Sequence, residues 1–205
     1  MDGGLFDGNG VLIGTKSKAW RSDRLPLAVT GRGFEKVVEA YALEIIDAVA
    51  NSTMSFDETV EGFLWILQER DAHQFSRLTE PQEFCICGIS ETRGPQVLVC
   101  KSMADKWFDV PFHFYEMGPF FSAVTPGQPD WFEPLGLTGS SPPGSLGGPL
   151  GVEAMTAVRQ QLPSPNGAAL AAGHIQYVRV TRAGTTSRIV HTWPDEIGKR
   201  VEVKR

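Results

Sequence analysis

The most regular pattern in the chain is a helical spacing of apolar residues that begins just after Gly33. Apolar positions recur every three or four residues with acidic residues between them, as in an amphipathic helix. A second helical pattern begins at Ser55-Phe56-Asp57-Glu58, which has the sequence of a capping box. These patterns predict helices over 34–50 and 55–73. The apolar positions of the first helix are Val37, Val38, Tyr41, Ala42, Ile45, Ile46 and Val49.

Strand patterns precede and follow this pair of helices. Residues 1–33 predict a hairpin region whose turn is Asp7-Gly8-Asn9-Gly10, because these residue types tolerate positive φ angles. Apolar runs bounded by turn residues predict later strands, and the segment 151–162 predicts a third helix. The later strands are expected over 83–90, 96–102, 175–182 and 187–193, with room for another within the aromatic-rich segment 110–124.

The order of strands, two helices, strands, a helix and strands is typical of an α+β layered domain. A chain of 205 residues is long enough for one substantial core, so we expect a single domain over residues 1–205. The stretch 125–149 interrupts it with many Gly, Pro and Ser residues, which do not favour regular structure. This stretch is either a flexible surface insertion or an interaction loop. The apolar residues that favour docking are Trp131, Phe132, Leu135 and Leu137.

Charge and composition exclude several classes of partner. The net charge is −5, and Lys and Arg are scattered, so no nucleic-acid groove is expected. No apolar run approaches the roughly 20 residues of a membrane-spanning helix, so no membrane partner is expected either. The three cysteines, Cys85, Cys87 and Cys100, suit a reducing compartment.

Candidate ligands for a metal or a cofactor are few. Cys85 and Cys87 would point to the same face of a strand, which fits structural thiols, with metal or redox use as the alternative. The four histidines lack the spacing of a metal site. We therefore expect neither a metal nor a cofactor.

Three residues of the N-terminal region carry a resemblance to a known family. Asp2, Lys18 and Gly31, together with the Gly-rich turn that opens the first helix, resemble the opening of proteasome β-type N-terminal-nucleophile (Ntn) hydrolases. In that family the Asp and the Lys support an N-terminal nucleophile, and the Gly donates an N–H group to the oxyanion. The resemblance implies a four-layer sandwich of two antiparallel sheets flanked by helices. Lys16 is a rival for the Lys role, because alternation places it on the same face as Lys18.

The chain also departs from this family pattern. The family's nucleophile begins a strand that precedes the Asp, whereas Met1 stands directly before Asp2. We therefore expect the first strand to be missing, Asp2, Lys18 and Gly31 to be vestigial, and the chain as written to lack hydrolase activity. The alternative is an amide or peptide hydrolase whose true start lies upstream of Met1. A third possibility is a binding module unrelated to the Ntn hydrolases.

A second resemblance involves the C-terminal hairpin. Residues 173–195, taken with Thr30-Gly31-Arg32-Gly33, are similar to small proteasome-like proteins encoded by phages and prophages. Membership would imply a non-catalytic structural or assembly protein in a virion or in the cytoplasm of a bacterial host. It would also imply a homo-oligomer or other subunits of an assembly as partners.

Overall fold

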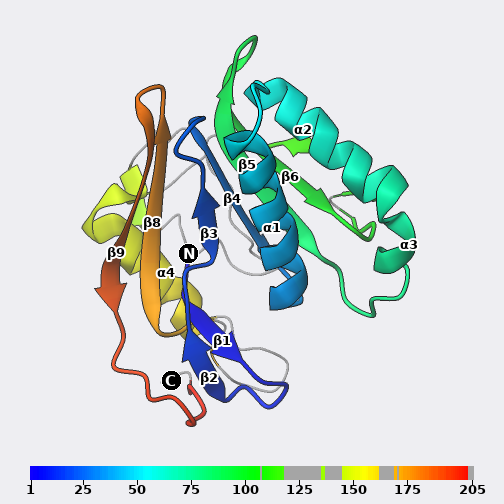
Figure 1. Cartoon of the computed structure of the whole chain (residues 1–205). Coiled ribbons are helices and arrows are strands. Elements are labelled where there is room, and N and C mark those ends of the chain that lie inside the picture. The colour runs from blue at the N-terminus through cyan, green and yellow to red at the C-terminus, as the bar shows by residue number, and fades with distance from the viewer. Residues whose placement is uncertain (107, 118–134, 137–144, 162–168, 170, 203–205) are drawn as a thin grey trace. The chain divides into compact units, whose positions relative to one another are not determined.

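The computed structural model describes residues 1–106, 108–117, 135–136, 145–161, 169 and 171–202 (Figure 1). The chain divides into two compact units. Unit 1 comprises Met1–Lys18, Pro119–Arg179 and Ser187–Arg205, and unit 2 comprises Ala19–Gly118 and Val180–Thr186. The strands pair into antiparallel sheets, and several helices accompany them. This confirms the α+β class, whereas the four-layer sandwich stays a prediction.

Unit 2 is built on a five-stranded antiparallel sheet in the order β3-β4-β5-β6-β7. Its central strands are the predicted ones, and the turn between β5 and β6 falls at the expected place. Only a two-residue strand forms within the segment 110–124 among the described residues. The bounds are β3 Ala19–Arg21, β4 Leu27–Arg32, β5 Glu83–Ser90, β6 Gly94–Lys101 and β7 Tyr115–Glu116.

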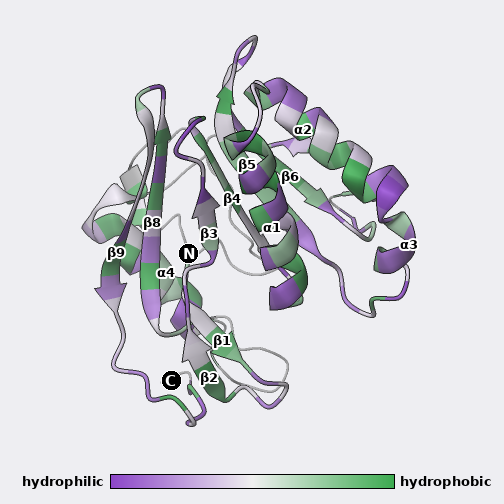
Figure 2. Ribbon diagram, in the orientation of Figure 1, coloured by the Kyte–Doolittle hydropathy of each residue, from purple (hydrophilic) through white to green (hydrophobic). Residues whose placement is uncertain are grey.

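Both predicted helices cover the same face of this sheet (Figure 1). Helix α1 spans Glu35–Ala50 and α2 spans Phe56–Trp65. Figure 2 shows apolar and polar residues alternating around both helices, as the sequence pattern predicts. Alternate residues of the three central strands meet the helices, because side chains along a strand point to opposite faces. The strand residues of this core are Leu27, Val29, Phe84, Ile86, Leu98 and Cys100, and they pack against α1 and α2 residues such as Val38, Tyr41 and Phe63.

The second helix does not continue regularly to His73, which corrects the prediction for 55–73. A π-helical turn spans Ile66–Arg70, and a short helix α3, Ala72–Phe75, follows. The N–H of Asp71 donates to the carbonyl of Ile66 at 3.0 Å, which closes the wider turn. Asp71 is thereby placed to accept a hydrogen bond of 2.9 Å from the Tyr41 hydroxyl in the core. A buried tertiary contact has therefore overridden the local helical pattern.

Unit 1 contains the N-terminal hairpin, formed by β1 Gly4–Phe6 and β2 Leu12–Thr15. Its turn is the predicted one: Asp7 Oδ1 accepts hydrogen bonds of 2.9 Å from the N–H groups of Asn9 and Val11. Gly10 closes the turn with a φ of 77°, which glycine adopts without strain.

The C-terminal hairpin and one helix complete the regular structure. Helix α4 spans Pro149–Gln161, β8 spans His174–Thr181 and β9 spans Gly184–Thr192. The hairpin prediction is confirmed, and its tip belongs to unit 2 while its base belongs to unit 1. No helix of the described residues combines the length and the hydropathy needed to cross a bilayer.

The predicted interaction loop is described only in part. Trp131, Phe132 and Leu137 lie outside the described residues. Leu135 packs against Ala154 of α4 together with Leu150 and Val158. Among the loop residues proposed for docking, Leu135 is therefore a contact within unit 1.

Candidate functional site

The structure brings Asp2 and Lys18 together in unit 1. The Lys18 ammonium lies 3.1 Å from Asp2 Oδ1, and the two side chains are only 24% and 19% exposed. The same carboxylate oxygen accepts a hydrogen bond of 3.0 Å from the N–H of Gly4. Asp2 thus pairs with Lys18, one of the two candidate lysines.

A buried glutamine on β8 organises the surroundings of this pair. The Gln176 amide donates to the hydroxyls of Ser17 and Ser187 at 2.7 and 2.8 Å, and its Oε1 accepts from the N–H of Lys18 at 3.1 Å. The side-chain donors and acceptor of Gln176 are thus all engaged, as burial requires. Sequence analysis missed this residue. The signal that the sequence offered was a polar residue between the apolar residues Ile175 and Tyr177.

The first three residues lie antiparallel beside β8. The Gln176 N–H donates to the carbonyl of Met1 at 2.7 Å, and the N–H of Gly3 donates to the carbonyl of His174 at 2.8 Å. Asp2 forms an isolated bridge with Ile175 between these bonds. Backbone hydrogen bonds therefore hold the N-terminal segment against β8, and the side-chain amide of Gln176 ties β8 to Ser17 and Lys18.

The α-amine of Met1 sits close to the ion pair and donates to the carbonyl of Gln176 at 3.1 Å. Burial lowers the pKa of this amine, the Asp2 carboxylate opposes that shift, and the Lys18 ammonium adds to it. An uncharged amine next to a Lys–Asp pair can accept a proton, which is the property that a general base needs.

Gly31 lies in unit 2, on β4, directly opposite Phe84 of β5. A Cβ at this position would come within 2.2 Å of the carbonyl oxygen of Glu83 and within 2.8 Å of Val38 Cγ1 on α1. Close packing of the sheet and the first helix thus requires glycine here. This requirement explains the residue without any role in binding an oxyanion.

The three cysteines lie on the two faces of the five-stranded sheet. The sulfurs of Cys85 and Cys87 lie 3.9 Å apart on one face of β5, while Cys100 is buried in the core on the other face. The hydrogen bond to Cys87, followed by burial, raises the pKa of Cys85, and burial raises the pKa of Cys100. Both thiols are therefore poor nucleophiles. No group of three or more potential metal-ligating side chains occurs among the described residues.

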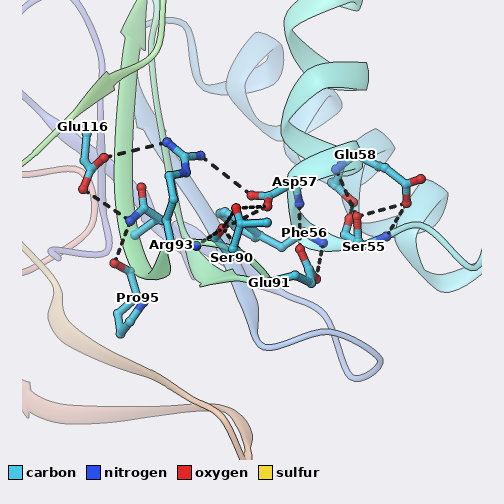
Figure 3. Close-up of polar contacts among 12 residues, drawn as sticks. Ser55, Phe56, Asp57, Glu58, Ser90, Glu91, Arg93, Pro95 and Glu116 are labelled. Atoms are coloured by element: carbon cyan, nitrogen blue, oxygen red, sulfur yellow. Dashed lines mark hydrogen bonds and ion pairs between the residues drawn. The ribbon is translucent and has the colours of Figure 1, made fainter.

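A polar cluster anchors the start of α2 to the turn between β5 and β6 (Figure 3). The Glu91 carboxylate accepts hydrogen bonds of 2.9 and 3.2 Å from the N–H groups of Phe56 and Asp57. Asp57 in turn accepts a hydrogen bond of 2.9 Å from the Ser90 hydroxyl. The predicted capping box of Ser55 and Glu58 is present beside these contacts. The cluster satisfies the helix terminus and thus has a structural purpose.

The ion pair of Asp2 and Lys18 should contribute measurably to stability. Replacing Lys18 with Ala is expected to lower the free energy of unfolding by about 1–2 kcal/mol, because the partly buried Asp2 carboxylate loses its partner. Urea unfolding followed by circular dichroism would measure the change.

The control for this variant is Lys199→Ala, which breaks the exposed pair of Lys199 and Glu196. An exposed pair contributes less than about 1 kcal/mol. Equal losses in the two variants would contradict the structural importance of the Asp2–Lys18 pair.

Comparisons with known proteins do not assign this site. No known protein-family model matches the chain. No curated protein matches it significantly.

Proposed function

We propose that this chain is a non-catalytic structural or assembly subunit with a proteasome-like fold, which works by self-association. The observation that carries the proposal is the edge of β9. Among the described residues, β9 pairs only with β8 in a two-stranded sheet, and residues 186–189 are exposed along it. Ile189 in this stretch is 60% exposed.

An exposed edge strand favours association for a general physical reason. Its unpaired N–H and C=O groups and its exposed apolar side chains form a surface that another chain can cover. Another subunit that covered the edge of β9 would pair these backbone groups and bury these side chains.

The polar network around Asp2 supports the same proposal. Backbone hydrogen bonds hold residues 1–3 beside β8, and the Asp2 carboxylate ties this segment to Gly4 and Lys18. A role in holding the N-terminal segment needs no substrate. In the phage and prophage proteins that the chain resembles, such a subunit would belong to the virion or to its assembly.

Light scattering over a range of concentrations tests self-association. We expect species larger than the 22.4 kDa monomer that grow with concentration. Ile189→Lys should weaken their formation, because a charge on an edge strand opposes pairing and burial. Ile197→Lys is the matched control, since Ile197 is 67% exposed and lies outside the strands. A monomer at every concentration would contradict the proposal.

One observation favours a second candidate, an N-terminal-nucleophile amide hydrolase present as a longer form of the chain. The Lys18 ammonium lies 3.1 Å from the Asp2 carboxylate, which is the arrangement that would support a nucleophile preceding Asp2. The test is to treat the protein isolated from its natural source with an inhibitor that acylates N-terminal nucleophiles. Stoichiometric labelling at one N-terminal residue would favour this candidate, and absence of labelling would favour the structural role.

A further inference from the structure

The helices of unit 2 carry an exposed tryptophan in acidic surroundings. Trp65, the last residue of α2, is 57% exposed, although the neighbouring Phe63 and Leu67 are buried in the core. Glu61 lies one helical turn before it and Glu69 about one turn after it, and both are exposed. We call these three residues the acidic row. Between Glu35 and Glu69 the sequence holds eight acidic residues and one lysine.

An exposed tryptophan on a well-packed helix is a typical anchor for association. Tryptophan buries a large apolar area when it docks, and it is enriched among the residues that dominate interface energies. The helix that presents Trp65 is fixed by the core on its other side, so little freedom is lost when the side chain docks. The acidic neighbours indicate that the docking surface is basic.

The C-terminal hairpin has the opposite charge. The sequence from Ala154 to Pro194 contains four arginines and no acidic residue. Arg179, Arg182 and Arg188 belong to this hairpin and are exposed. Arg188 is held in place, because it donates to the carbonyl of Gly147 at 2.9 Å and lies over the Tyr177 ring at 5.7 Å.

A groove accompanies the basic edge of β9 in unit 1. It has a volume of about 380 Å³, within the range of pockets that accept small apolar groups. Arg188, Ile189 and Val190 of β9 line it together with Pro149 and Val152 of α4. The groove therefore offers apolar walls together with a cation.

We propose that the acidic row of one copy docks on the β9 edge of a second copy, with Trp65 in the groove and its flanking carboxylates facing Arg188. The inference rests on the proposed self-association and names the surfaces that carry it. The occupant is a second copy because one chain carries both charge-complementary surfaces, an acidic helix row and a basic strand edge. A helix lying along an edge strand is also one of the ways in which proteins cover such edges.

This contact joins two different surfaces, so a pair of copies keeps one unused surface of each kind. Such a head-to-tail contact gives a closed ring when the rotation between copies closes, and an open filament when it does not. Assembly should also weaken with rising salt, because exposed charges that attract each other are screened.

Charge reversal tests the pairing of the two surfaces by sedimentation velocity. Glu61→Lys with Glu69→Lys, and separately Arg188→Glu, are each expected to weaken the subunit affinity by about tenfold or more. A chain that carries all three changes should recover most of the affinity, because the two surfaces are complementary again. Trp65→Ala should weaken affinity by a similar factor without recovery. Asp23→Lys with Glu196→Lys is the control for net charge, since both residues are exposed and lie outside the two surfaces.

The outcomes separate this inference from the proposed function. If the native protein assembles and the variants assemble equally well, the docking surfaces are wrong while self-association stands. If single changes weaken assembly but the combined chain does not recover, the acidic row and Arg188 do not meet. A native protein that stays monomeric contradicts both proposals. Circular dichroism of each variant would establish that the loss reflects the interface rather than the fold.

Discussion

Replacing Arg159 with alanine is expected to lower the free energy of unfolding by about 3–5 kcal/mol, because it leaves a buried carboxylate without its partner. Two nitrogens of Arg159 on α4 contact the two oxygens of Asp195 at 2.7 and 2.5 Å. The side chains are 17% and 7% exposed. The Arg159 guanidinium also lies 4.7 Å from the centre of the Trp193 ring. Denaturant unfolding would measure the loss.

This ion pair also predicts how stability depends on pH. Burial acts to raise the pKa of Asp195, but hydrogen bonds from Arg159 and from the N–H of Gly173, with the charge of Arg159, outweigh it and lower the pKa. A carboxyl whose pKa is lower in the folded state stabilises the fold above its unfolded pKa of about 4. That contribution disappears as the pH falls through the folded-state pKa.

The variants should separate charge from geometry in this pair. Arg159→Ala should flatten the acid dependence below about pH 4, whereas Arg159→Lys should keep part of it, because lysine retains the charge but not the two parallel hydrogen bonds. A loss of less than 1 kcal/mol with an unchanged acid dependence would mean that the pair contributes little.

Gly31→Ala is expected to destabilise the protein by about 3 kcal/mol, at the upper end of the range for overpacked sites. The added Cβ would lie 2.2 Å from a backbone oxygen of β5, so β4 and β5 must separate locally. Thermal unfolding would measure the effect. Gly62→Ala on α2 is the matched control, because its Cβ would meet only Met54 Cε at 3.4 Å.

The control should be neutral or stabilising by up to about 1 kcal/mol, since alanine favours helices more than glycine does. Equal stability of the two variants would contradict the packing explanation for Gly31. Gly31 would then need another explanation, such as the donation of its N–H group to a ligand.

Elements with a local signal were predictable from the sequence. The capping box of Ser55 and Glu58, the turn at Asp7 and the alternation in the hairpins depend on residues close in the chain, so their patterns fix α2, β1–β2 and β8–β9. The end of the second helix was not predictable, because Asp71 is set by its distant partner Tyr41.

The site was predictable only as far as the family resemblance extended. Asp2 and Lys18 were placed together by analogy, but Gln176 lies 159 positions from Ser17, and no local pattern links them. Arg159 and Asp195 are 36 positions apart. No local pattern links these two residues either, and they meet only in the folded chain. Long-range hydrogen bonds of this kind depend on topology, which periodicity does not reveal.

The π turn over Ile66–Arg70 makes this part of unit 2 sensitive to chain length. Such a turn amounts to one residue inserted into a regular α-helix. Deleting that residue would make the bond from the Asp71 N–H to the Ile66 carbonyl an ordinary α-helical one and would keep Asp71 facing Tyr41. Straightening the turn without a deletion would instead rotate everything after it by about 100° around the helix axis, and Asp71 would turn away from Tyr41. Among related chains, a single-residue deletion within this turn should therefore be tolerated better than a deletion elsewhere in α2.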